Sequence, residues 1–145
     1  LLGEYHHNID DKGRLVIPTK YREELGSEFV ITRGIERCLY VYSKIEWEKL
    51  VAKLNTLPFT KKDARTFMRS FFSGATVGKF DNSGRINITS PLVSYADLTK
   101  ECVIIGVNDR LEIWSEDAFT KFMDDNSSEL EEIAEHLFEV SNETL

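Results

Sequence analysis

The sequence has few cysteines, few histidines and no long hydrophobic run. Two cysteines among 145 residues, Cys38 and Cys102, exclude a disulfide-stapled scaffold. Both begin short apolar, strand-like stretches, so we expect buried, reduced thiols rather than nucleophiles. No stretch approaches the roughly 18 apolar residues of a membrane span. A 41% apolar and 30% charged composition is instead typical of one soluble domain, or of two very small ones.

The residue patterns of common catalytic sites are also missing. We find no nucleophile–base pair, no glycine-rich phosphate loop and no cluster of metal ligands. His6 and His7 are adjacent, so on a strand they face opposite sides and cannot easily share a metal. A hydrolase built on Asp10 and Asp81 is disfavoured for the same reasons. The sequence predicts no enzyme, no catalytic residue, no metal or cofactor, and no small-molecule substrate.

Negative charge is concentrated at one end of the chain. The net charge is −7, but residues 116–145 alone hold ten acidic side chains and one lysine. Residues 1–115 hold 17 basic and 15 acidic side chains. Because the body is mildly basic, the overall acidity does not exclude a local basic patch or a nucleic-acid partner.

An internal repeat dominates the sequence. Residues 9–18 (IDDKGRLVIP) recur as residues 80–89 (FDNSGRINIT), 71 positions later. The match continues with residues 39–43 (LYVYS) and 111–115 (LEIWS). Each copy spans about 45 residues, which is too short to bury a good core alone. The repeat therefore predicts two copies packed into one pseudo-symmetric unit.

Both copies predict the same local structure. A strand leads into the tight turn Asp-x-x-Gly-Arg, in which Gly13 and Gly84 supply a positive φ. Asp10 and Asp81 can accept backbone N–H bonds across these turns. A short strand and a helical turn follow in each copy, and then two further strands, at 28–33 and 38–42, or 101–107 and 110–114. Amphipathic helices are predicted within 47–54, 64–72 and 130–138, which gives an α+β fold.

Arg14 and Arg85 are the first candidates for function, because they follow the turn glycines at equivalent positions. A forked guanidinium at the tip of a turn suits phosphate contact or bidentate reading of guanine. Lys12 adds a second cation to the first turn. The alternative is that each arginine pairs with the aspartate of its own turn and only fixes the turn. Both roles are compatible, because the aspartate can orient an arginine that also touches a ligand.

Other basic residues are weaker candidates. Lys20 and Arg22 follow the second strand and are candidates for phosphate contact beside the first turn. Lys61, Arg65 and Arg69 recur every four residues and so share one helix face. That face is either solvated, or it contacts a nucleic-acid backbone or the acidic residues of a neighbouring subunit.

Three segments of the chain resemble the MraZ family of transcriptional regulators. They are residues 3–18 (GEYHHNIDDKGRLVIP), residues 60–75 (TKKDAR running to FFSGA) and residues 103–114 (VIIGVNDRLEIW). The resemblance extends over residues 2 to about 140. It implies a swapped-hairpin DNA-binding fold of the AbrB/SpoVT group, with two modules per chain and an Asp-x-x-x-Arg signature in each, here Asp10–Arg14 and Asp81–Arg85.

The resemblance also implies a division of the chain. We expect two AbrB/SpoVT-like β-rich modules packed as one unit, with connecting helices and a C-terminal helix. The expected segments are a first module at 1–55, a connecting helix at 56–76, a second module at 77–122, and an acidic C-terminal helix and tail at 123–145.

The function implied by the resemblance is promoter binding. Members of the family form ring-shaped homo-oligomers that bind direct repeats in double-stranded DNA upstream of the division and cell-wall gene cluster, which they usually repress. The expected location is the cytoplasm, at the nucleoid, without a membrane partner. The alternative is a ring-forming scaffold that does not bind DNA, which would account for the acidic C-terminal segment. The family pattern is broken at Ser83 and Thr89, so we expect the first module to supply more of the phosphate-binding charge.

Overall fold

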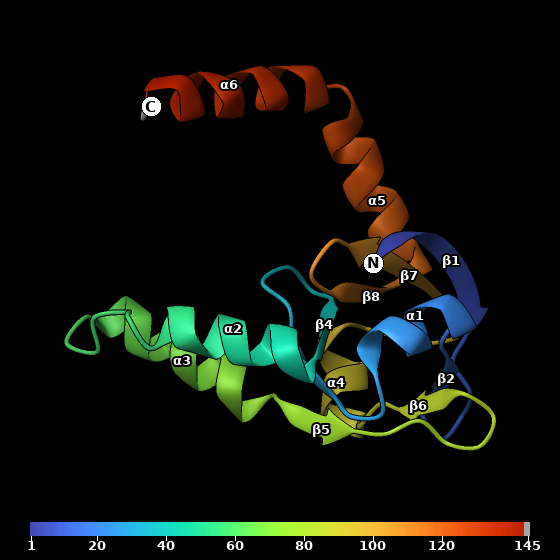
Figure 1. Cartoon of the computed structure of the whole chain (residues 1–145). Helices are drawn as coiled ribbons and strands as arrows, with labels where there is room; N and C mark the ends of the chain where they lie inside the picture. Colours follow the sequence, from blue (N-terminus) through green and yellow to red (C-terminus); the bar gives the residue numbers. More distant parts are fainter. Residues whose placement is uncertain (144–145) are drawn as a thin grey trace.

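The computed structural model describes the backbone of residues 1–143 and the side chains of residues 1–139. The last two residues of the expected C-terminal tail lie outside the described range. The same order of seven elements occurs twice along the chain (Figure 1). In the first half these are β1 (Leu2–Asn8), β2 (Arg14–Val16), α1 (Thr19–Leu25), β3 (Phe29–Arg33), β4 (Leu39–Ser43), α2 (Lys44–Leu54) and α3 (Lys62–Ser73).

The second half repeats this order. Its elements are β5 (Thr76–Gly78), β6 (Arg85–Asn87), α4 (Ser90–Tyr95), β7 (Glu101–Val107), β8 (Leu111–Ser115), α5 (Glu116–Ser127) and α6 (Leu130–Glu143). Ser43 and Ser115 occupy equivalent positions, and each hydroxyl accepts a backbone N–H bond at the start of the helix that follows. The predicted α+β architecture with two modules is therefore confirmed.

The two halves exchange strands. The six-stranded sheet has the order β1-β7-β8-β4-β3-β5, and every neighbouring pair is antiparallel. Strand β1 of the first half pairs with β7 of the second, and β5 of the second pairs with β3 of the first. Strands β4 and β8 meet at the centre, and β2 pairs with β6 in a separate two-stranded ribbon. Neither half forms a complete sheet by itself.

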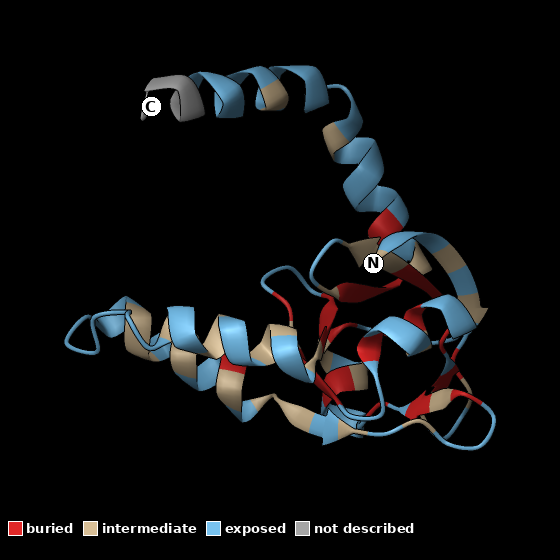
Figure 2. Ribbon diagram, viewed as in Figure 1, coloured by how far each residue is buried: buried red, intermediate tan, exposed pale blue. Residues whose placement is uncertain are grey.

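The main core also belongs to both halves. Leu15 and Ile17 after the first turn, and Ile86 and Ile88 after the second, are buried in one cluster. Figure 2 shows the buried segments gathered where the ribbon, the short helices and the sheet meet. This shared core agrees with the small size of each repeat, because about 45 residues cannot exclude enough water alone.

A second apolar cluster lies where helices α2, α3 and α5 pack on the sheet. Trp47 of α2 stacks on Phe71 of α3 with ring centroids 5.6 Å apart, and Phe67 stacks on Phe71 at 5.4 Å. Cys38 belongs to this cluster and Cys102 to the main core, and both are buried free thiols, as predicted. Within residues 1–143, no helix is long and apolar enough to cross a membrane.

Candidate nucleic-acid interface

The β2–β6 ribbon brings the two Asp-x-x-Gly-Arg turns together. Its register pairs Arg14 with Asn87, Leu15 with Ile86 and Val16 with Arg85. Two further backbone bonds extend the ribbon, from Ile17 N–H to the Gly84 carbonyl at 3.1 Å and from Ile88 N–H to the Gly13 carbonyl at 2.7 Å. Each turn is therefore held by the strand of the other half.

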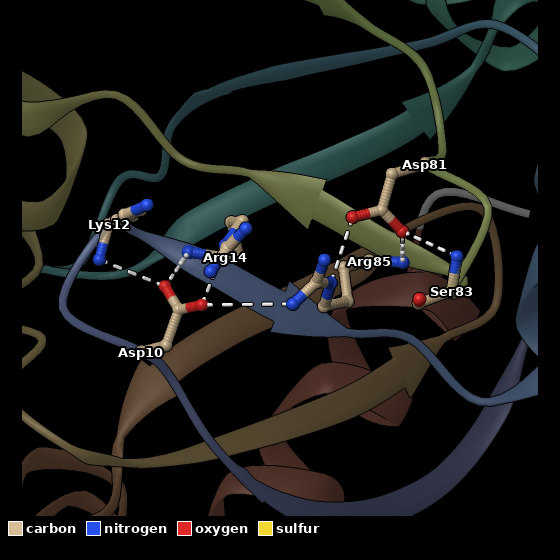
Figure 3. Close-up of polar contacts among 6 residues, drawn as sticks. All are labelled: Asp10, Lys12, Arg14, Asp81, Ser83 and Arg85. Atoms are coloured by element: carbon tan, nitrogen blue, oxygen red, sulfur yellow. Dashed lines mark hydrogen bonds and ion pairs between the residues drawn. The ribbon is translucent and has the colours of Figure 1, made fainter.

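The first turn is organised by Asp10. One carboxylate oxygen accepts the backbone N–H bonds of Lys12 at 2.9 Å and Arg14 at 2.8 Å, and the other accepts Arg14 Nε at 2.7 Å (Figure 3). Gly13 adopts φ 79° and its N–H donates to the Asp10 carbonyl, which closes the turn. The sequence-predicted roles of Asp10 and Gly13 within the turn are confirmed.

The second turn repeats this geometry. Asp81 accepts the backbone N–H bonds of Ser83 and Arg85, each at 2.9 Å, and Arg85 Nε at 2.8 Å. Gly84 adopts φ 74°. In addition, Arg85 Nη1 lies 3.9 Å from a carboxylate oxygen of Asp10, so the two turns interact across the ribbon. Figure 3 shows both arginines between the two aspartates.

Hydrogen bonding keeps both aspartates ionised. The backbone N–H of Arg14, followed by its side chain and the Lys12 N–H, lowers the pKa of Asp10 below its ordinary value of 3.8. The backbone N–H of Arg85, its side chain and the Ser83 N–H lower the pKa of Asp81 in the same way. At neutral pH each aspartate therefore remains an acceptor for the arginine beside it.

The arginines are only partly used by these pairs. Each aspartate takes the Nε of its arginine, and the side chains of Arg14 and Arg85 are 35% and 30% exposed. The terminal nitrogens of Arg14 have no protein partner among the described residues, and Arg85 has only the long contact to Asp10. Since a guanidinium carries five N–H donors, each arginine can be fixed by its aspartate and still bind an external anion or base edge.

Sequence reasoning missed two residues on the outward side of the ribbon. Val16 and Asn87 are exposed, whereas the alternating Leu15 and Ile86 are buried. Strand alternation places Val16 beside Arg14, and Asn87 beside Arg85. The alternation was visible in the sequence, but only the pairing of β2 with β6 shows that these side chains share one surface.

The remaining predicted site residues lie around the first turn and α1. The side chain of Lys12 is exposed at the tip of the first turn, and Lys20 is exposed at the start of α1. Arg22 is different, because its Nη2 donates to Thr19 Oγ1 at 2.6 Å and its guanidinium packs against Gly84. The Arg22 side chain from the first half therefore braces the turn of the second half.

The equivalent position in the second half lacks this brace. Val93 on α4 corresponds to Arg22 by the 71-residue offset, and it lines a hollow of about 280 Å³ beside the first turn. Asp10, Lys12 and Gly13 line the same hollow. The two turns thus share one hydrogen-bond pattern but differ in what supports them.

No three His, Cys, Asp or Glu side chains within the described part of the chain gather as a metal site.

Comparison with known proteins shows the family of the chain. The model of the family described as "MraZ protein, putative antitoxin-like" matches the chain twice, over residues 1–70 and 71–141. A protein from Lactobacillus helveticus described as "Transcriptional regulator MraZ" is 50% identical over 139 residues, which are 96% of this chain and 97% of that protein. Each half of the chain matches the same family model, and the relative aligns with almost the whole chain. The chain therefore belongs to the MraZ family of transcriptional regulators.

Proposed function

We propose that this protein regulates transcription by binding double-stranded DNA with the outer face of the β2–β6 ribbon. The observation that carries the proposal is the pair of equivalent arginines, each fixed through Nε by an aspartate and each with a partly exposed side chain. A two-stranded ribbon fits the major groove of B-form DNA, and a guanidinium fork matches guanine or phosphate oxygens. Asp10 and Asp81 would act on DNA only by orienting Arg14 and Arg85.

The neighbouring residues have separate roles in this proposal. Lys12 and Lys20 supply phosphate contacts around the first turn, and Arg22, which packs against Gly84, supplies one beside the second turn. Such contacts add affinity without sequence information. Asn87 shares the ribbon face with the arginines, and its amide can pair with adenine in the major groove. The additional cations beside the first turn support a larger phosphate contribution from the first module.

Membership of the MraZ family supports a proposal for the biological target. We propose that the protein acts in the cytoplasm, at the nucleoid, and binds direct repeats in the promoter of the division and cell-wall gene cluster as a ring-shaped homo-oligomer. A single ribbon offers few base contacts, so several linked copies on successive repeats would raise the effective concentration of each further contact. Occupied repeats would exclude RNA polymerase and repress the cluster.

The acidic C-terminal segment favours a second function, a ring-forming scaffold without DNA binding. Ten of the 25 acidic side chains lie in residues 116–145, and such a surface repels DNA. The two partly exposed arginines favour the regulator, because a scaffold needs no arginine with unused N–H donors at both turns. Retention on heparin separates the two functions, since only the regulator is expected to bind this polyanion despite its net charge of −7.

A mobility-shift titration on the chain's own promoter region tests the proposal. Wild type is compared with Arg14→Ala, Arg85→Ala, Asn87→Ala and Lys12→Ala at two salt concentrations. Loss of a base contact costs about 1–3 kcal/mol of binding free energy and relaxes the sequence preference. Loss of a phosphate contact weakens binding to all sequences equally and lowers the slope of log affinity against log salt concentration by about one. We expect the first behaviour for one or both arginines and for Asn87, and the second for Lys12.

The control is Lys121→Ala, which removes the same charge from α5, away from the ribbon (Figure 1). It should bind DNA like wild type, and all variants should keep the wild-type molar mass. If wild type does not bind the promoter DNA at either salt concentration, the result contradicts the regulator function and favours the scaffold function. If wild type binds and both arginine variants bind equally tightly, the arginines only fix the turns and the DNA surface lies elsewhere.

A further inference from the structure

The two equivalent helix pairs of the chain are arranged differently. Helix α3 folds back along α2 and buries Phe71 against Trp47 and the sheet. Helix α6 instead turns away from α5 and lies apart from the rest of the molecule (Figure 1). Figure 2 shows the arm formed by α5 and α6 exposed along most of its length.

Helix α6 carries an uncovered apolar stripe. Leu130, Ile133, Leu137 and Phe138 recur at helical spacing and are between 40% and 72% exposed. A helix of 14 residues is marginal in water without packing, so a partner for this stripe would stabilise it. Successive residues of the helix turn by about 100°, which places Glu131 at one border of the stripe and Glu132 and Glu139 on the opposite face. Glu129 directly precedes the helix, and its carbonyl accepts the N–H of Ile133, so it lies at the other border of the stripe.

The tip of the α2–α3 hairpin offers a complementary surface. It contains a hollow of about 210 Å³ lined by Leu57, Phe59, Ala64, Arg65, Met68 and Arg69. Phe59 is 81% exposed, and Arg65 Nη1 donates to its carbonyl at 3.0 Å, which fixes the loop at the tip. The hollow is therefore lined by four apolar side chains and two arginines.

The charges of the two surfaces are opposite. Residues 44–73, which include the hairpin, hold seven basic and three acidic side chains, whereas residues 116–145 hold ten acidic side chains and one lysine. Such complementarity steers two surfaces together and fixes their register. An apolar helix face bordered by glutamates fits a hollow lined by apolar side chains and arginines.

We propose that α6 of one copy packs its apolar stripe on the α2–α3 hairpin tip of a second copy, with Glu129 and Glu131 facing Arg65 and Arg69. Every chain carries one arm and one tip, so each copy binds one neighbour with its arm and another with its tip. Such head-to-tail contacts generate rings when the rotation between copies closes. The inference rests on the ring of the proposed function and assigns the surfaces that build it.

Charge reversal with rescue tests the contact. Glu129→Arg/Glu131→Arg places like charges on the arm and the tip, as does Arg65→Glu/Arg69→Glu. Either variant alone should lose the wild-type assembly and approach the molar mass of a single chain by light scattering. An equal mixture should restore the large species, because each reversed surface then meets an opposite one on the other variant. Circular dichroism checks that both variants remain folded.

The matched control is Glu132→Arg/Glu139→Arg, which changes the charge equally on the opposite face of α6 and should keep the wild-type assembly. If both charge-reversed variants remain fully assembled, or if their mixture regains no large species, the contact is overturned while the oligomer of the proposed function stands. If wild type itself is a single chain, both the contact and the ring fail, and the mobility shift decides DNA binding separately. In a further outcome, the mixture stays monomeric, but the variant that carries all four substitutions regains the thermal stability of wild type. That result would place α6 on the hairpin of its own chain and overturn the contact between copies.

Discussion

At the scale of single residues, one carboxylate in each turn performs three tasks. Asp10 accepts two backbone N–H bonds that shape the turn, and it holds Arg14 through Nε. Asp81 does the same for Arg85. Because the aspartate fixes the near side of the guanidinium, binding of the proposed DNA partner would cost the arginine less side-chain entropy than it would cost an unpaired arginine.

The pKa of each turn aspartate should lie below 3.8 in the folded protein. The lowered pKa of both groups means that their stabilising bonds are complete above this value and are lost as the pH falls through the lowered values. Carbon-detected NMR titration of the carboxyl groups measures the two midpoints. Asp10→Asn identifies the resonance of Asp10, and a midpoint at or above 3.8 for either group contradicts the hydrogen-bond pattern.

The two turn glycines should respond differently to alanine. Both have positive φ, so alanine costs about 1–2 kcal/mol of unfolding free energy at each position. A Cβ at Gly13 would overlap the backbone carbonyl of Ile88, whereas a Cβ at Gly84 would meet the flexible end of Arg22. Urea unfolding should show a greater loss for Gly13→Ala than for Gly84→Ala.

Arg22→Ala provides the control for this comparison. In the Gly84→Ala background, Arg22→Ala should lower the unfolding free energy less than it does in wild type, because the substitution removes the side chain that the new Cβ displaces. In the Gly13→Ala background its effect should be additive. If the coupling free energy between Arg22→Ala and the glycine substitution is the same for Gly13→Ala and Gly84→Ala, Arg22 does not brace the second turn.

At the scale of elements, β8 shows how a strand can bury charge. Glu112 is only 6% exposed, and it accepts two bonds from Arg110, at 3.0 and 2.8 Å, and one from Trp114 Nε1 at 3.0 Å. Arg110 also lies over the ring of Tyr40 on β4, 4.6 Å from its centroid. Residues 112 and 114 share one face of the strand, and pairing with β4 places Tyr40 directly opposite Glu112 on that face.

Removing the buried carboxylate should destabilise the fold strongly. Glu112→Ala removes the acceptor of the Trp114 indole N–H and leaves Arg110 with only its bond to Asp109, so we expect a loss of about 2–4 kcal/mol of unfolding free energy. Glu112→Gln should lose less, because an amide oxygen can still accept from the indole. Chemical denaturation measures both, with exposed Glu101→Ala on β7 as the control within about 0.5 kcal/mol of wild type. A Glu112→Ala value equal to the control contradicts this role.

At the scale of the whole molecule, strand exchange makes the two halves depend on each other. The pairs β1–β7, β3–β5, β2–β6 and β4–β8 all join residues from different halves. The main core is likewise shared. The repeat is thus one folding unit built from two copies, in agreement with the small size of each copy.

Residues 1–75 and 76–145, expressed separately, should each fail to give a folded monomer. Each half alone leaves strand edges unpaired and half of the core exposed. Mixing the two should yield a folded 1:1 complex with the circular dichroism of the intact chain. A dispersed NMR spectrum from either half as a monomer would show that strand exchange is not required for folding.

Most of the local structure could be predicted from the sequence, but most of the contacts between residues far apart in the chain could not. The strand at 28–33 and the helix within 64–72 agree with β3 and α3, because apolar periodicity acts over neighbouring residues. The position of Arg22 against Gly84 could not be predicted, because the two residues are 62 positions apart and no local pattern links them. The outward surface shared by Arg14 and Asn87 likewise depends on which strand pairs with β2.

The sequence by itself determined the turns and their chemistry. Asp10 reaches Arg14, and Asp81 reaches Arg85, within five residues, so the pairing needs only the local turn and its glycine. The 71-residue repeat likewise determined that two equivalent modules would form. The tertiary structure decided which strands exchange, which arginine braces a turn, and that α3 folds back while α6 projects. These features depend on packing between distant segments, where apolar patterns allow several partners and only the three-dimensional arrangement selects one.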